Sequence, residues 1–405
     1  MSAASASASP GHRNVAVLAL AQALFMSIQG MGIATTPLAA YALLGVDDKW
    51  LATVPIFLNH LGIMATTIPA SLLMGVIGRR AGFTLGALLG VGFGAIGCLA
   101  IYQQSFALLC VAAFLQGMQG AFFWYFRLAA ADSAAPDRRA KAISLVMAGG
   151  VVAGFIGPQA AKLTVDWLAP VMFAGVYVAA GGVSLAVLAL VQLLRIPRLT
   201  AVERAVGGRP LLEILRQPAF KVALAASVFG YAVMTITMSA TPLAMLACGY
   251  TFVDSASVIQ MHIVGMFLPS FFTGHLISRF GVLTIIAVGG LIEFAGVSAN
   301  LAGIQFANFA IANILIGVGW NFAYVGGSTL LTTTYLPAER AKVQAAHDFT
   351  VYGATATSAA LSGVLQAKAG WLIINLAAVP FMAVLIGAAL WLAALQRRTA
   401  VQPAE

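Results

Sequence analysis

Two pairs of side chains, each spaced by four residues, combine sulfur with imidazole or with more sulfur. They are Met234-x-x-x-Met238 and His262-x-x-x-Met266. This spacing places both members of a pair on one face of a helix, with their Cβ atoms about 6 Å apart. Thioether and neutral imidazole favour Cu(I), whereas Mg²⁺ or Ca²⁺ would need several oxygen ligands. The spacing therefore predicts a soft-metal site formed by Met234, Met238, His262 and Met266.

A second His-x-x-x-Met pair, His60 and Met64, lies earlier in the chain. The sequence has 405 residues, five of them His and 14 of them Met, so chance supplies about 0.2 such pairs and about half a Met-x-x-x-Met pair. Methionine also fills gaps between packed helices, so the Met pair alone proves little. We take His60 and Met64 as weaker candidate ligands. Cys248, which follows Met238 near the end of the same segment, is another weaker candidate that could relay an entering ion or simply pack.

The composition shows what kind of element positions these side chains. The chain is 61% hydrophobic and 8% charged, with a mean hydropathy of +0.96, whereas a soluble domain is about a quarter charged. Apolar stretches of transmembrane length, about 20 residues, recur from Val15 to Leu395, and in lipid they must be helical. We predict an all-α membrane protein with twelve spans near 14–44, 50–78, 83–103, 106–131, 141–164, 167–195, 219–248, 253–280, 283–304, 305–335, 341–366 and 370–396.

The distribution of basic residues predicts the orientation. If both termini are cytoplasmic, the outer loops hold only Lys49, Lys162 and Lys368, and almost all other Lys and Arg lie inside, as the positive-inside rule requires. The net charge of +9 then reflects orientation and contact with anionic membrane lipid. We expect no nucleic-acid partner. The three cysteines have no paired spacing, which argues against a disulfide or zinc framework.

The chain divides into two similar halves. We expect a disordered terminus at 1–13, a six-helix bundle at 14–195, a cytoplasmic linker at 196–218, a second bundle at 219–396 and a tail at 397–405. Three segments of the first half recur in the second in the same order, as transporters with internal repeats often show. The pairs are 34–45 with 239–250, 75–83 with 274–282, and PDRRAK (136–141) with PAERAK (337–342).

Segment 75–83, GVIGRRAGF, resembles the loop motif Gly-x-x-x-Asp-Arg-x-Gly-Arg of the major facilitator superfamily. The resemblance covers 14–396 and implies two six-helix bundles that rock about a central cavity. Arg79 stands where the family has the Asp that helps to lock its outward-facing state, so the gate must work differently or more weakly. GGVVAGFIGP, with Gly150, Gly154, Gly157 and Pro158, resembles the family's antiporter motif without its last glycines. Close helix packing explains these glycines better.

The two pairs Met234-x-x-x-Met238 and His262-x-x-x-Met266 resemble those of the CcoA-type bacterial copper importers of the same superfamily. The resemblance implies copper import across the bacterial cytoplasmic (inner) membrane for assembly of cytochrome oxidase. It also implies these four residues as the metal-binding set. A cytoplasmic copper chaperone or a copper-loading exporter would be the protein partner, and copper would be substrate, with no cofactor.

Other polar residues in the predicted helices carry less weight. Asp348 is expected to be a cap or gate residue, with proton carriage as the alternative, and Glu293 to pair within its bundle. No catalytic constellation and no Gly-x-x-x-x-Gly-Lys run occurs, so we expect no enzyme activity and no ATP hydrolysis. A proton-coupled exporter of a small organic solute is the alternative function. A sensor or scaffold without transport is a third reading, supported only by Arg79.

Overall fold

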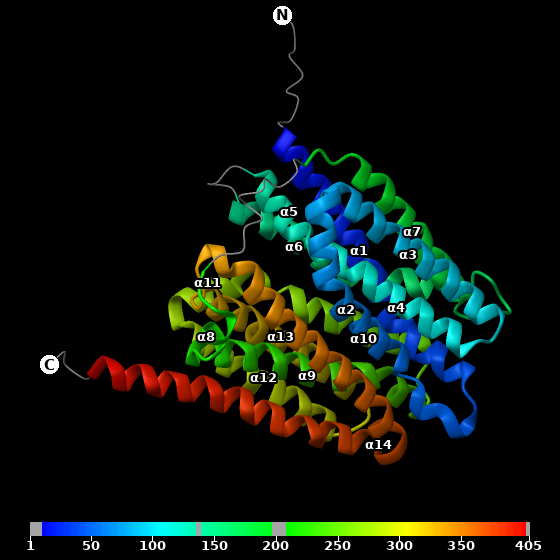
Figure 1. Ribbon diagram of the computed structural model, residues 1–405. Helices are drawn as coiled ribbons and strands as arrows, with labels where there is room; N and C mark the ends of the chain where they lie inside the picture. Colours follow the sequence, from blue (N-terminus) through cyan, green and yellow to red (C-terminus); the bar gives the residue numbers. More distant parts are fainter. Residues whose placement is uncertain (1–9, 135–138, 197–207, 402–405) are drawn as a thin grey trace, which may run out of the picture.

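The computed structural model describes residues 10–134, 139–196 and 208–401. These residues form helices joined by short turns, and no strand occurs among them. In Figure 1 the helices of the first half, from blue α1 to green α7, form one group, and the green-to-red helices of the second half form another beside it. The all-α prediction is confirmed.

The first half of the chain contains seven helical segments and one short 3-10 turn. They are α1 (Pro10–Leu43), η1 (Val46–Leu51), α2 (Val54–Ile77), α3 (Arg79–Tyr102), α4 (Phe106–Phe123), α5 (Phe126–Ser133), α6 (Arg139–Thr164) and α7 (Ala174–Gln192). Within this half α1 packs against α6, α3 against α7 and α2 against α4.

The second half repeats this arrangement with more breaks. Its elements are α8 (Leu211–Leu215), α9 (Pro218–Ala247), α10 (Phe252–Phe267), α11 (Ser270–Phe280), α12 (Val282–Leu301), α13 (Phe306–Thr332), η3 (Pro337–Glu339) and α14 (Arg340–Val401). Here α14 packs against α9, and α12 packs against α13.

Three breaks within membrane-spanning segments explain why the helices of the structure differ in number from the twelve predicted spans. Ten described helices are long and apolar enough to cross a membrane, and α10 with α11, bent by 41° between them, makes an eleventh span. Helix α14 contains one non-helical residue, Gly370 with φ 77°, where its orange and red parts change direction (Figure 1). Counting α14 as two spans gives the twelve expected. The first half breaks instead at Trp124 and Tyr125, between α4 and α5.

Several predicted bounds are wrong. Residues 10–13, expected to be disordered, belong to α1, and the predicted start at 83 is too late because α3 begins at Arg79. The predicted start at 167 is too early. Val165–Phe173 forms a non-helical turn that ends with a backbone hydrogen bond of 3.0 Å from Phe173 to Val165. The linker and the tail also contain helix, as α8 and as the end of α14.

The loop motif at 75–83 forms its contacts inside the first half. Arg79 makes an ion pair with Asp132 of α5, and Arg80 donates to the side-chain oxygen of Gln192 on α7 at 3.2 Å. The expected departure from the family pattern is therefore visible. The cation at position 79 binds an acid of its own bundle.

The PAERAK segment (337–342) of the second half contacts the linker. Glu339 accepts hydrogen bonds from the Arg209 guanidinium at 2.8 and 3.0 Å and from its backbone N–H at 2.7 Å. These donors, the side chain first, lower the pKa of Glu339 to about 2, so the carboxylate stays ionised at neutral pH. Residues 135–138 of the matching PDRRAK segment lie outside the described residues.

The two halves meet near the turns that follow α1, α6 and α9. A Cβ on Gly363 of α14 would lie 2.3 Å from the Thr53 hydroxyl, so a glycine is needed where α14 meets the start of α2. Nearby, the rings of Phe173 and Phe252 make an edge contact at 5.6 Å between centroids. Away from this end, α11 packs on α12 and α13 of its own half. The halves are therefore closed against each other at this end.

Candidate functional site: a central cavity with two unlike walls

A cavity lies between the two halves and contains about 940 Å³ of empty space, including the part open to solvent. Its lining residues come from both halves: Met26, Gln29, Gly30, Gly32, Ile33, Thr36, Pro55, Ile56, Asn59, His60, Ile63, Ala113, Gln116, Trp124, Tyr231, Met234, Met238, Ile263, Met266, Phe267, Trp320 and Tyr352. None of these is Asp, Glu, Lys or Arg, so the lining offers no ion pair to a solute.

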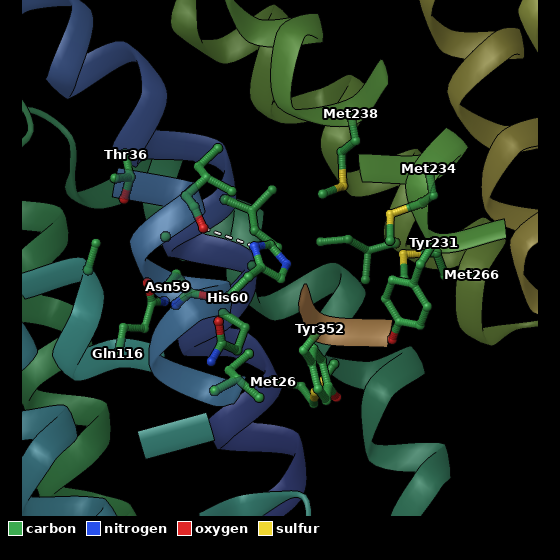
Figure 2. A pocket seen from close by; sticks show the side chains of 18 of the residues that line it. Met26, Thr36, Asn59, His60, Gln116, Tyr231, Met234, Met238, Met266 and Tyr352 are labelled. Carbon is green, nitrogen blue, oxygen red and sulfur yellow. Dashed lines mark hydrogen bonds between the residues drawn. The ribbon is translucent and has the colours of Figure 1, made fainter. Parts of the chain in front are cut away.

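The wall from the second half is sulfur-rich and aromatic. Figure 2 shows the sulfur atoms of Met234, Met238 and Met266 on this side, close to Tyr231. Behind them Tyr231 meets Trp320 edge-on, with ring centroids 5.1 Å apart. Thioethers and aromatic faces are polarizable, and both make favourable contacts with planar rings.

The wall from the first half carries amides and an imidazole. Asn59 and His60 come from α2, and Gln116 comes from α4 (Figure 2). Gln116 donates to the Ile28 carbonyl oxygen at 3.2 Å. The dashed line in Figure 2 joins Nδ1 of His60 to the Ile56 carbonyl oxygen at 2.9 Å. Because a carbonyl only accepts, Nδ1 carries the proton, and Nε2 is left as a hydrogen-bond acceptor.

Four lining residues carry an N–H group that has no hydrogen-bond partner. They are Gln29, Asn59, Trp124 and Trp320, through Nε2, Nδ2, Nε1 and Nε1. A buried donor without a partner costs about 1–3 kcal/mol. A solute whose acceptor atoms reached these donors, after the side chains turned toward it, would recover that free energy.

The structure splits both predicted His-x-x-x-Met pairs. Met266 lines the cavity, but His262 is fully buried elsewhere, with Nδ1 at 2.7 Å from the Asn313 carbonyl oxygen of α13. In the other pair His60 lines the cavity. Met64 does not, and its sulfur lies against α14, 3.3 Å from where Gly353 would carry a Cβ.

The predicted metal set is therefore only partly assembled at the cavity. Met234, Met238 and Met266 share one wall, whereas His262 does not contribute. Cys248 is exposed at the end of α9, outside the lining. No group of three or more His, Cys, Asp or Glu that could hold a metal occurs within the described ranges. The ligand roles of these residues stay predictions.

The polar wall was missed at the sequence level, although a signal for it exists. Gln29, Asn59, Gln116 and Trp124 lie within apolar spans. Polar side chains in a membrane helix are costly and usually functional. Attention to amide and indole N–H groups as well as to sulfur and imidazole would have found them.

The fold and this central cavity define a membrane transporter built from two bundles. Residues 48–297 match the family model of the Major Facilitator Superfamily, and the chain belongs to that family. It is a multi-pass membrane protein of the secondary-transporter type, as expected from the loop motif.

Two bacterial relatives extend over nearly the whole chain. The riboflavin transporter RfnT of Brucella anthropi is 38% identical over 382 residues, 94% of this chain and 95% of that protein. The uncharacterized MFS-type transporter YddS of Bacillus subtilis is 30% identical over 89% of this chain and 86% of its own length. The copper-importer resemblance is not supported by these relatives.

Solved structures agree on the fold. A bacterial homolog of the human lysosomal transporter Spinster, in an inward-facing and unoccupied conformation, matches with a TM-score of 0.70 and 15% identity over 95% of this chain and 96% of that one. The transporter FucP in the outward conformation matches with a TM-score of 0.62 and 16% identity, over 93% and 98%.

Proposed function

We propose that this protein transports a neutral, planar, nitrogen-containing aromatic solute of the riboflavin class. The observation that carries the proposal is the pairing of unpartnered N–H donors with an aromatic and thioether wall in a cavity without Asp, Glu, Lys or Arg. Riboflavin has a flat tricyclic ring with carbonyl oxygens and ring nitrogens that accept hydrogen bonds. It also has one imide N–H that donates.

The cavity offers a partner for each part of such a ring. The indole N–H groups of Trp124 and Trp320 and the amides of Gln29 and Asn59 meet its acceptor atoms. The free Nε2 of His60 accepts from the imide N–H. The faces of the ring lie against the sulfur and aromatic side chains of the other half. The nearly full-length similarity to a riboflavin transporter supports the same class of solute.

Copper is the competing substrate, favoured by the three sulfur atoms on one wall. The same cavity opposes it, because N–H donors present partial positive charge and cannot ligate a cation. His262, the imidazole of the predicted set, is fully buried outside the lining, with Nδ1 held by the Asn313 carbonyl oxygen and Nε2 without a partner. The organic-solute alternative therefore accounts for more of the site than copper does.

The transport cycle proposed is alternating access by rocking of the two bundles. In the described conformation the halves meet at the end where Thr53 faces Gly363. With both termini cytoplasmic, as the basic residues predict, that end is the outer one and the cavity opens inward. Movement of the first bundle against the second would then expose the same two walls to the other side.

The test is transport by the purified protein in liposomes. Vesicles preloaded with unlabelled riboflavin should take up radiolabelled riboflavin by exchange, and vesicles holding a copper-sensitive dye should show no copper-dependent signal above protein-free vesicles. Copper flux without riboflavin exchange would replace the proposal with copper import. Binding without flux of either would support a sensor.

A matched substitution separates the two substrates further. Met234→Leu removes a cavity sulfur but keeps most of the volume, and Met382→Leu does the same for a buried methionine of α14 outside the lining. A copper transporter should lose most of its flux in the first variant only. A riboflavin transporter should keep most of its exchange in both.

A further inference from the structure

Glu293 is a carboxyl group in the middle of a membrane-spanning helix. It lies near the centre of α12 (Val282–Leu301), and its side chain is 0% exposed. Neither of its oxygens has a hydrogen-bond partner. The expectation that Glu293 pairs within its bundle is therefore wrong. No other carboxyl group of the described residues is both fully buried and unpartnered.

Two glycines make the space that this side chain occupies. A Cβ on Gly319 of α13 would lie 2.6 Å from Cγ of Glu293, and a Cβ on Gly230 of α9 would lie 3.8 Å from its Oε1. Alanine at 319 would collide with the glutamate. Helices α9 and α13 thus leave a recess for the carboxyl group, which enters it from α12.

No hydrogen bond from the surrounding helices reaches the carboxyl group of Glu293. Tyr231 on α9 and Tyr324 on α13 follow the two glycines, and their ring centroids are 5.1 Å apart. Arg127 and Asp348 interact electrostatically with both tyrosines. The part of α14 next to Gly230 contributes Leu385. An isolated carboxylate in such a place costs many kcal/mol, so the group is stable only with a proton bound.

The recess lies directly behind the aromatic wall of the cavity. Gly230 precedes Tyr231 and Gly319 precedes Trp320, and both aromatic residues line the cavity. Because α9, α12 and α13 all belong to the second bundle, the seam that holds Glu293 opens when α9 or α13 shifts within that bundle as the aromatic wall responds to the solute. In a conformation that admits water to this seam, Glu293 can be an ionised carboxylate. In the described conformation, which is dry, Glu293 must carry a proton.

We propose that Glu293 is the proton-binding site that couples solute transport to a proton gradient. One carboxylate takes up one proton in one conformation and releases it in the other, with no other bond formed or broken. Because charge is tolerated in only one of the two conformations, the proton shifts the equilibrium between them. The inference rests on the proposed transport function and adds its source of energy.

The experiment compares wild type with Glu293→Gln in liposomes. Glutamine keeps the shape of the side chain but cannot bind and release a proton. Wild type should accumulate riboflavin about tenfold for a gradient of one pH unit if one proton moves with each solute. The variant should not concentrate riboflavin, so the inside and outside concentrations should become equal. Its exchange of riboflavin at equal pH should stay near the wild-type rate. Asp166→Asn, which removes an exposed carboxylate outside the spans, should behave as wild type.

A second readout does not depend on riboflavin. Infrared difference spectra of the protein in liposomes, recorded as the pH is stepped, should show the C=O band of a protonated carboxyl group. Glu293→Gln should abolish this band, Glu293→Asp should shift it, and Asp166→Asn should leave it unchanged. If either Glu293→Gln or Glu293→Asp fails to fold, the remaining variant still shows whether the C=O band belongs to Glu293.

Two results would overturn the proposal. One is gradient-driven accumulation in Glu293→Gln equal to that of wild type. The other is a carboxyl band that is absent from wild type or unaltered by both Glu293 variants. If wild type carries no riboflavin, the proposed substrate fails while the infrared band still decides whether Glu293 binds a proton.

Discussion

Helices α2 and α10 carry the same motif, His-x-x-x-Met, and present opposite members of it to the cavity. In α2 the cavity receives His60, and Met64 lies against α14. In α10 it receives Met266, and His262 bonds to α13. The two pairs have the same sequence pattern, but one presents its histidine to the cavity and the other presents its methionine.

The reversal follows from helix geometry. Residues four apart differ by about 40° around a helix. In both α2 and α10 the edge of the cavity falls between the two side chains of the pair, so one faces the cavity and the other faces the neighbouring helix. Spacing therefore identifies a shared face of the helix, but it does not fix which side chain crosses the edge of that face.

The largest expected effect comes from the two histidines. His60→Ala removes the acceptor Nε2 from the cavity, so the KM for riboflavin exchange should rise about tenfold, equivalent to about 1.4 kcal/mol. His262→Ala should leave KM unchanged and instead lower the melting temperature, because it empties a fully buried site. Equal KM increases in both variants would show that the two histidines are not used differently.

A smaller change in KM is expected for the tryptophans, which again compare a cavity residue with a residue outside the cavity. Trp320→Phe keeps an aromatic ring and removes one N–H, which should raise KM about fivefold, or about 1 kcal/mol. Trp371 also has an unpartnered N–H but lies outside the lining, against Phe309 at 5.3 Å. Trp371→Phe should not change KM. Rates measured over a range of riboflavin concentrations would separate KM from the maximum rate.

The smallest effect is expected for the methionines of the two pairs. Met266→Leu alters the cavity wall while conserving volume, so KM should change by less than about threefold. Met64→Leu should leave KM unaltered and alter the rate of exchange, because Met64 lies at the moving contact between α2 and α14. A larger change in KM for Met64→Leu than for Met266→Leu would contradict the assignment of the walls.

Hydropathy predicted the fold well because lipid forces every apolar span into a helix. It also separated the spans 341–366 and 370–396, which α14 breaks at Gly370. It could not locate the breaks at Trp124 and Pro269, since the apolar character continues through both.

The site was predicted less completely for a different reason. Met234, Met238, Met266 and His60 do line the cavity, since residue type and spacing mark a helix face. The exclusion of His262 depends on the Asn313 carbonyl oxygen, a backbone atom that no side-chain pattern reveals. The choice of solute depends on N–H groups from α1, α2, α13 and the break after α4, which are brought together only by the fold.

The most direct test of the central claim is equilibrium binding to the purified protein. Riboflavin is fluorescent, and stacking against Trp320 and its neighbours should quench that fluorescence in a saturable way that Cu(I) does not reverse. Quenching lost in Trp320→Ala and kept in Trp371→Ala would agree with the account. Tight Cu(I) binding with no saturable quenching by riboflavin would contradict it.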